Sequence, residues 1–181
     1  MSNANLPTQG GATALAERGA SRQYLTFTLG GELFAMPIEQ IREIIEFGGM
    51  TEIPLMPGFL RGVINMRGAV VPVIDLAVRF GRERTEIARR TCIVIIELEQ
   101  EGQMLLLGVL VDAVNEVLTV EPGQVEPRPA FGARIRAEFI EGMINLDQRF
   151  VIALDIRLVL SVDELATLIG MAAETGATAG E

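Results

Sequence analysis

Residues 59–76 read FLRGVINMRGAVVPVIDL, and residues 139–156 read FIEGMINLDQRFVIALDI. The two stretches align without a gap. They share phenylalanine, glycine, isoleucine, asparagine, valine and aspartate at equivalent positions, and most other pairs exchange one apolar residue for another. Self-similarity of this kind is the signature of an internal repeat. The chain is therefore predicted to consist of two related halves.

The repeat extends upstream of these stretches. Residues 38–44 (IEQIREI) and 111–117 (VDAVNEV) share an apolar–acidic start, an apolar fourth residue, a glutamate at the sixth position and an apolar seventh. The segment is predicted to be extended or weakly helical. Each half then contains a hairpin, this segment, a second hairpin and a short helix. So many short strands in roughly 60 residues favour a small closed barrel, because closure removes exposed strand edges.

Four pairs of β-rich runs flank short turn sequences, which is the pattern of β-hairpins. The pairs are 24–29 with 33–38, 63–66 with 70–74, 92–98 with 104–111, and 139–146 with 149–154. Helical runs are expected at 76–80, 156–160 and 162–173, the last with Ser161 as its N-cap. The sequence thus predicts a mainly β domain with short connecting helices and a C-terminal helix.

Residues that are identical in both halves are expected to have the same structural role in each half. Gly62 and Gly142 are predicted to lie where a side chain would clash or where φ is positive. Asp75 and Asp155 each precede a short apolar-periodic run, so helix capping explains them. If both aspartates are caps, the most obvious pair of catalytic carboxylates is already used by the fold.

Composition excludes several classes of function. The chain has 181 residues, 49% of them hydrophobic, yet its longest apolar run, 104–111, is far too short to span a bilayer. A net charge of −9 disfavours binding to nucleic acid or to an anionic membrane surface. The absence of histidine removes the commonest general base and most zinc sites, and the single cysteine, Cys92, is expected to be a buried, inert thiol. No phosphate-binding glycine loop occurs. No catalytic residue, metal site or cofactor is predicted, and a cytoplasmic location is expected.

Positions at which the halves differ are the better functional candidates. The first half has Met66-Arg67-Gly68 where the second has Leu146-Asp147-Gln148. Arg67 at a hairpin tip is either an anchor at a protein contact, where arginine is enriched, or a member of an ordinary surface ion pair. The rival from another class is a carboxylate-only hydrolase using Asp75, Asp155 or the acidic stretch 97–101, which would need two carboxylates about 5–5.5 Å apart in a cleft.

Several motifs, in the same order, resemble the CheW coupling proteins of bacterial chemotaxis. The matching stretches are 23–45, 53–81, 109–120 and 139–156, which together span about residues 22–160. Within them, RGVINMRG (61–68) followed by PVIDL (72–76) is similar to the most recognisable motif of the family, with Met66 where leucine is usual.

The resemblance implies two SH3-like five-stranded β-barrels packed through a shared apolar interface. It places the CheW-like domain at 22–161, with halves at about 22–82 and 90–161, between a disordered leader (1–21) and a C-terminal helix (162–173) with a disordered tail (174–181). The sequence does not decide which strands close which barrel, because the two halves can exchange a strand.

The resemblance also implies a role and partners. A CheW-like adaptor bridges the regulatory domain of the histidine kinase CheA and the cytoplasmic tips of methyl-accepting chemoreceptors, in arrays at the inner face of the membrane. It inserts no segment into the membrane and binds no nucleic acid. A coupling protein of a non-flagellar chemosensory pathway fits the sequence equally.

By resemblance, Ile41, Glu43 and Arg67 are implied receptor contacts. If residues 38–44 are extended or weakly helical, Ile41 and Glu43 are expected to lie towards solvent and Ile38 and Ile44 to pack inward. Core packing for Ile41 and a solvated charge for Glu43 remain open alternatives. Arg61 and Gly62 match a stretch near the kinase-facing surface of the family. A purely structural role is also open for both.

Overall fold

The computed structural model describes residues 20–127, 135–147 and 149–160. The predicted helix at 162–173, and most of the leader (1–21) and the tail (174–181), lie outside the described residues. The strands are β1 (Arg22–Leu29), β2 (Glu32–Pro37), β3 (Ile41–Glu46), β4 (Leu60–Met66), β5 (Ala69–Asp75), β6 (Cys92–Gln100), β7 (Gln103–Val111), β8 (Ala113–Val120), β9 (Val125–Glu126), β10 (Ile140–Leu146) and β11 (Arg149–Leu154). The short helices are α2 (Leu76–Arg79) and α3 (Ile156–Leu160), and single 3-10 turns lie at η1 (Ile38–Gln40), η2 (Pro122–Gln124) and η3 (Ala137–Phe139).

All four predicted hairpins are present: β1–β2, β4–β5, β6–β7 and β10–β11 are antiparallel pairs. The turns of two of these hairpins contain residues with positive φ. Gly30 and Gly31 both have positive φ, at 59° and 83°, and so do Arg67 and Gly68, at 52° and 90°. Two successive residues with positive φ make the two-residue turn whose twist matches that of the flanking strands. The two predicted short helices are also present.

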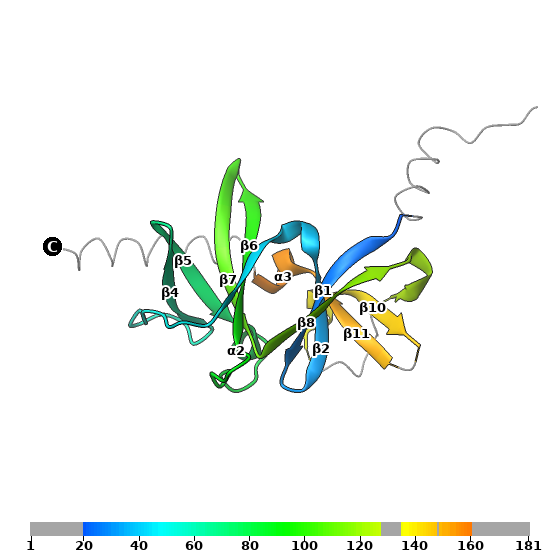
Figure 1. The fold of residues 1–181 in the computed structure, drawn as a ribbon, viewed down its shortest axis with the longest axis horizontal. Helices are drawn as coiled ribbons and strands as arrows, with labels where there is room; N and C mark the ends of the chain where they lie inside the picture. The colour runs from blue at the N-terminus through cyan, green and yellow to red at the C-terminus, as the bar shows by residue number, and fades with distance from the viewer. Residues whose placement is uncertain (1–19, 128–134, 148, 161–181) are drawn as a thin grey trace, which may run out of the picture.

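The strands form two sheets, seen side by side in Figure 1. One sheet has the order β3-β6-β7-β5-β4 and is contiguous in sequence; we call it the contiguous barrel. The other has the order β8-β1-β2-β11-β10-β9 and combines the two ends of the described chain; we call it the discontinuous barrel. The two halves of the repeat therefore exchange their first hairpins: β1–β2 joins strands of the second half, and β6–β7 joins strands of the first.

Each sheet closes into an SH3-like barrel through the chain that follows its edge strand. After β3, Thr51 and Val63 of β4 exchange two backbone hydrogen bonds, at 2.9 and 2.8 Å. After β8, the chain turns through η2 and returns as β9 to pair with β10. The segments predicted as extended or weakly helical are thus the strands β3 and β8, and each leads into the closure of a barrel.

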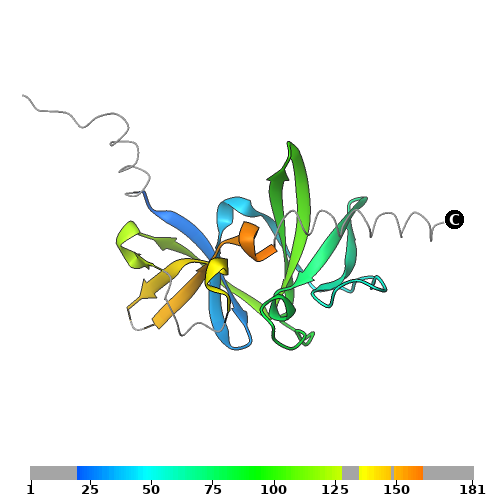
Figure 2. The same cartoon turned by 180° about the vertical axis from the view of Figure 1, so that it is seen from behind.

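Three apolar clusters hold the molecule together. Six buried residues, including Tyr24 and Val151, fill the discontinuous barrel, and five, including Val71 and Ile95, fill the contiguous one. The largest cluster lies between the barrels and draws on both sheets, on α2 and on α3, which sits at the junction in Figure 2. Because most of the buried apolar surface belongs to this shared cluster, the two barrels stabilise each other.

Candidate functional site

The glutamate and arginine singled out from the sequence form an ion pair. Arg67 at the tip of the β4–β5 hairpin places its Nη1 3.2 Å from Oε2 of Glu43 on β3. The Arg67 side chain is 75% exposed and that of Glu43 27% exposed, so the pair lies at the protein surface. β3 and the β4–β5 pair lie at opposite edges of the sheet. The ion pair therefore ties the two edges of the contiguous barrel together.

The third implied receptor contact, Ile41, is placed differently from the expectation. Ile41 is half-buried against the core between the barrels, whereas Ile44 is 42% exposed. The prediction for Ile44 was wrong, although Ile38 does pack inward as expected. The cause is a β-bulge: Ile41 and Glu43 pair with consecutive residues of β6, so the residue between them is additional and the alternation of faces shifts.

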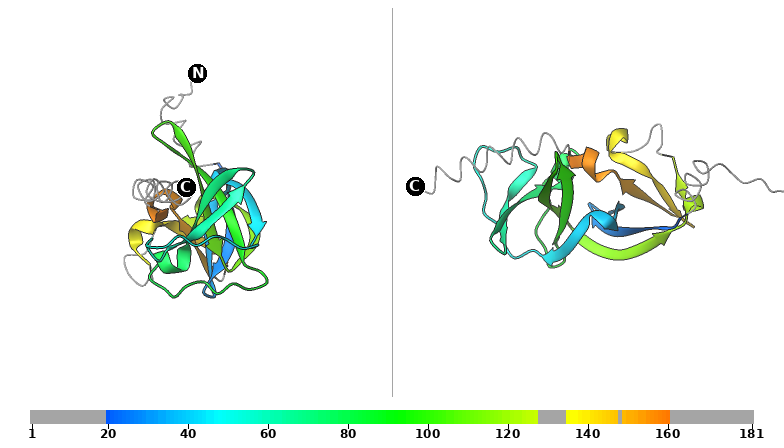
Figure 3. Two further views of the ribbon diagram at one scale, coloured as in Figure 1. Left: turned by 90° about the vertical axis from the view of Figure 1, so that its left-hand side faces the viewer. Right: turned by 90° about the horizontal axis from the view of Figure 1, so that it is seen from above.

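β8 repeats this arrangement in the other half. Val114 stands where the first half has Ile41 and packs against the same core between the barrels. Val117 stands where the first half has Ile44 and is 52% exposed. β3 and β8 lie on the same face of the molecule, at the front in Figure 1 and along the lower edge of the right-hand view in Figure 3. The repeat thus leaves one apolar side chain exposed on the edge strand of each barrel.

Arg61 has a structural role, because its guanidinium group is bound within the protein. Its guanidinium Nη1 donates to Asp75 Oδ2 at 2.7 Å and to the carbonyl oxygen of Thr85 at 3.0 Å, and its side chain is 11% exposed. The fully buried Asp75 also accepts hydrogen bonds from Thr85 N, Thr85 Oγ1 and Ala77 N. The last of these is the predicted N-cap of α2. Arg61 and Asp75 therefore hold residues 75–85 against β4.

Gly62 is required for barrel closure. A Cβ atom built at Gly62 would lie 2.4 Å from the carbonyl oxygen of Thr51, which pairs with the neighbouring Val63. Gly142 occupies the same point of the other barrel, where a Cβ would lie 3.0 Å from the carbonyl oxygen of Glu126 and 2.9 Å from a methyl group of Val125. The predicted clash is confirmed, and the repeated glycine marks the place where the closing segment crosses the strand.

The loop between Thr51 and β4 carries an apolar side chain that the sequence reasoning did not single out. Leu55 is fully exposed and has a φ of 64°, a conformation that non-glycine residues rarely adopt. Pro54 and Pro57 flank it within the sequence IPLMPG (53–58). Leu55 is thus held in solvent by a strained, proline-flanked loop. The only feature of the sequence that could have indicated Leu55 is its place as an apolar residue between two prolines.

A polar network fixes the start of β1. The hydroxyl of Tyr24 and the guanidinium of Arg22 both donate to Glu141 Oε1 at 2.8 Å, and Arg22 also pairs with Glu39. Burial, together with the hydrogen bond to Glu141, raises the pKa of Tyr24 to about 12. Glu141 stands where the first half has Arg61. Both of these repeat-equivalent residues therefore hold distant segments of the fold together.

The aspartates behave as caps. Asp155 accepts a hydrogen bond from the backbone N–H of Leu158 in α3, as Asp75 does from α2. In the described part of the chain, no group of three or more acidic or cysteine side chains is arranged to hold a metal ion. Among the helices of these residues, none is both long enough and apolar enough to cross a membrane.

Comparison with known proteins gives a consistent result. The family model of the CheW-like domain matches residues 23–164. The chain is 33% identical over 152 residues to the chemotaxis protein CheW of Klebsiella aerogenes, covering 84% of this chain and 89% of that protein. It is 32% identical over 143 residues to the probable chemotaxis protein CheW of Rhizobium etli, covering 79% and 90%. The crystal structure of the scaffolding protein TtCheW from Thermoanaerobacter tengcongensis superposes with a TM-score of 0.69 at 32% identity, covering 77% of this chain and 92% of that one.

Proposed function

This chain belongs to the CheW-like family of chemotaxis scaffolding proteins, and on that premise we propose that it couples chemoreceptors to the histidine kinase CheA. The family is one of adaptors, not enzymes. The capping roles of Asp75 and Asp155 agree with this, because the fold already uses the most obvious pair of catalytic carboxylates.

The observation that carries the proposal is the face formed by the edge strands β3 and β8, which lie on the same side of the molecule in Figures 1 and 3. Ile44 and Val117, at equivalent positions of the two halves, leave about half of their surface in water. Exposed apolar side chains beside ordered charged groups are typical of protein contacts, where a few anchors supply most of the affinity. This face takes the receptor tip. Ile41 and Val114 support it from within, and the Arg67–Glu43 pair forms its polar edge.

The kinase-facing surface lies on the contiguous barrel. We assign it to the loop that carries Leu55, at the outer end of that barrel and at the far left in Figure 1. Arg61 and Gly62 serve this surface indirectly. Gly62 lets Thr51 close the barrel, and Arg61 lines a cavity of about 270 Å³ together with Met56 and Pro57 of the same loop. Both residues set the position of the loop and leave contact with the kinase to Leu55.

Two separate surfaces are what an adaptor needs. When a receptor occupies one surface and the kinase the other, each bound partner raises the effective concentration of the other. Contacts of this transient kind are small, about 1,200 Å² or less in total, so single exposed residues matter. Through the receptors, the chain would gather in arrays at the inner face of the membrane.

The proposal is tested by co-purification of the full chain with a receptor cytoplasmic fragment and with the regulatory domain of CheA, separately and together. We expect binary complexes with each partner and a ternary complex with both. Ile44→Glu should remove only the receptor, and Leu55→Glu only the kinase. Loss of both partners from either variant would contradict two separate surfaces. Failure of the unaltered chain to bind either partner would contradict the function itself.

A further inference from the structure

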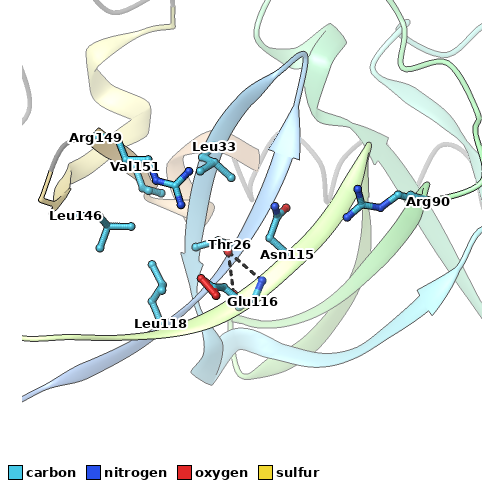
Figure 4. Close-up of a pocket in the computed structure, with 9 residues that line it drawn as sticks. All are labelled: Thr26, Leu33, Arg90, Asn115, Glu116, Leu118, Leu146, Arg149 and Val151. Atoms are coloured by element: carbon cyan, nitrogen blue, oxygen red, sulfur yellow. Dashed lines mark hydrogen bonds between the residues drawn. The ribbon is translucent and has the colours of Figure 1, made fainter.

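A cavity of about 290 Å³ opens at the mouth of the discontinuous barrel, beside β8 and the β10–β11 hairpin (Figure 4). The guanidinium groups of Arg149 and Arg90 point towards it from opposite sides in this view. Its volume is at the small end for ligand sites, which suits one or two side chains rather than a cofactor. The cavity is lined by Thr26, Leu33, Arg90, Asn115, Glu116, Leu118, Leu146, Arg149 and Val151.

The two halves of the chain differ at the place where this cavity lies. In the contiguous barrel the fully buried Ile95 faces the bulge of β3, and Arg67 reaches across to Glu43. In the discontinuous barrel Thr26 faces the bulge of β8 and is satisfied by both backbone groups of Glu116, at 2.9 and 3.1 Å.

The residue that would close this second mouth has also changed. Asp147 stands where the other half has Arg67, and its φ of 56° is nearly the same as the 52° of Arg67. An aspartate cannot pair with Glu116, the counterpart of Glu43. The mouth that an ion pair closes in one barrel therefore stays open in the other.

The arginines at the cavity are unusual within this chain. Among the described arginines, all but Arg89, Arg90 and Arg149 pair with a carboxylate or a carbonyl oxygen. Two of those three line the same cavity. With Glu116 as the one acidic lining residue, the cavity carries a net positive charge in a chain of net charge −9.

We propose that this cavity binds an acidic side chain of a partner protein, with a neighbouring apolar residue of that partner on its floor. Arginine matches a carboxylate with two parallel hydrogen bonds, so each of the two guanidinium groups at the cavity can hold a carboxylate. Leu33, Leu118 and Leu146 provide the apolar floor. The site is additional to the receptor and kinase surfaces, and it does not depend on the function proposed for them.

The test uses the full chain and a fluorescein-labelled peptide, acetyl-Gly-Glu-Leu-Glu-Gly-amide, followed by fluorescence anisotropy. We expect saturable binding that Arg90→Glu and Arg149→Glu each weaken at least tenfold. Arg89→Glu, with the same change of charge on an unpaired arginine outside the lining, should change the affinity less than twofold. No binding to the unaltered chain, or an equal loss in the Arg89 variant, would overturn the proposal.

A second variant tests closure directly. Asp147→Arg should rebuild, with Glu116, the ion pair that closes the other barrel, and should weaken peptide binding although it adds a positive charge. Stronger binding would contradict the role of the open mouth. Competition with free glutarate separates the two sources of a carboxylate: displacement only at far higher concentration than an unlabelled peptide supports a protein partner, and displacement at equal concentration overturns it in favour of a small anion.

Discussion

Arg67 and Glu43 form a two-pronged ion pair, with Nη1 3.2 Å from Oε2 and Nη2 3.5 Å from Oε1. The pair joins a hairpin tip to a strand at the other edge of the same barrel. Because the arginine is three-quarters exposed, solvent screens the pair, and its contribution to the free energy of unfolding is expected to be at most about 1 kcal/mol. Its importance is expected to lie in the surface that it shapes.

Arg67→Ala should therefore weaken binding to a receptor cytoplasmic fragment about tenfold while shifting the melting temperature by only a few degrees. Arg42→Ala is the matched control, because it removes another exposed ion pair of β3, Arg42–Glu97. Calorimetry and a pull-down on the same preparations measure both quantities. A large fall in melting temperature for the Arg67 variant would show that the residue is structural.

Ile44→Glu and Val117→Glu should each abolish receptor binding without a marked loss of stability, because both side chains already face water. Ile41→Glu is expected to behave differently. It would press a carboxylate against the core between the barrels and cost about 2 kcal/mol or more of folding free energy. Met104→Glu, at a residue 57% exposed on β7, is the control and should bind normally. Normal receptor binding by both the Ile44 and Val117 variants would remove this face from the interface.

Gly62→Ala should destabilise the chain by about 1–3 kcal/mol, because its Cβ meets a backbone oxygen that is fixed by barrel closure. Gly142→Ala should cost less, since the nearest atom is a side-chain methyl group and the backbone oxygen lies further away. Gly123→Ala meets nothing within 4 Å and should be neutral. Urea unfolding orders the three variants. If Gly123→Ala lowered the free energy of unfolding more than the other two substitutions, the role of Gly62 and Gly142 in barrel closure would be contradicted.

The repeat allowed much of the fold to be predicted, because hairpins and caps are specified locally. The paired turns, the capping role of Asp75 and the crowding at Gly62 all follow from residues close in sequence. The exchange of hairpins does not, since it depends on which edges meet after collapse and both pairings satisfy the same pattern.

The candidate site was harder to predict than the fold. A single additional residue in β3 reversed the exposure of Ile41 and Ile44, and no feature of the sequence marks that bulge. Leu55 was missed because exposure of one apolar residue in a loop is a property of the folded backbone. Arg67 was singled out because the halves differ there, and an ion pair was one of its two expected roles. Glu43 was found by resemblance and was not named as the partner of Arg67.

Asp75→Ala and Asp155→Ala provide a second comparison between the halves. Asp75 is fully buried and pairs with Arg61. Its loss leaves the largely buried guanidinium without its carboxylate, with the carbonyl oxygen of Thr85 as its remaining partner, and should cost about 3–5 kcal/mol. Asp155 is partly exposed and makes a single capping bond of 3.3 Å, so its loss should cost about 1 kcal/mol. Equal losses in denaturant unfolding would contradict the difference in their surroundings.

Tyr24 makes stability depend on alkaline pH. An unfolded tyrosine titrates near pH 10, whereas in the folded chain the pKa of Tyr24 is about 12. Between these values the unfolded state releases a proton that the folded state keeps. The stabilisation is therefore complete below pH 10 and is lost as the pH rises through about 12. Tyr24→Phe should lack this part of the decline in urea unfolding. Because Tyr24 is the only tyrosine, its ultraviolet absorbance reports the pKa directly, and a titration near pH 10 would contradict the prediction.

The exchanged hairpins also set an order for folding during synthesis. All strands of the contiguous barrel lie between Ile41 and Val111, so that barrel can close as soon as Val111 has left the ribosome. The discontinuous barrel cannot, because β1 and β2 emerge first, whereas their neighbour β8 follows the contiguous barrel and β11 is the last strand to emerge. The first hairpin to be made must therefore wait, with its apolar face uncovered, until nearly the whole domain has been translated. During that interval the nascent chain is most exposed to chaperones and to misassembly with a neighbouring copy.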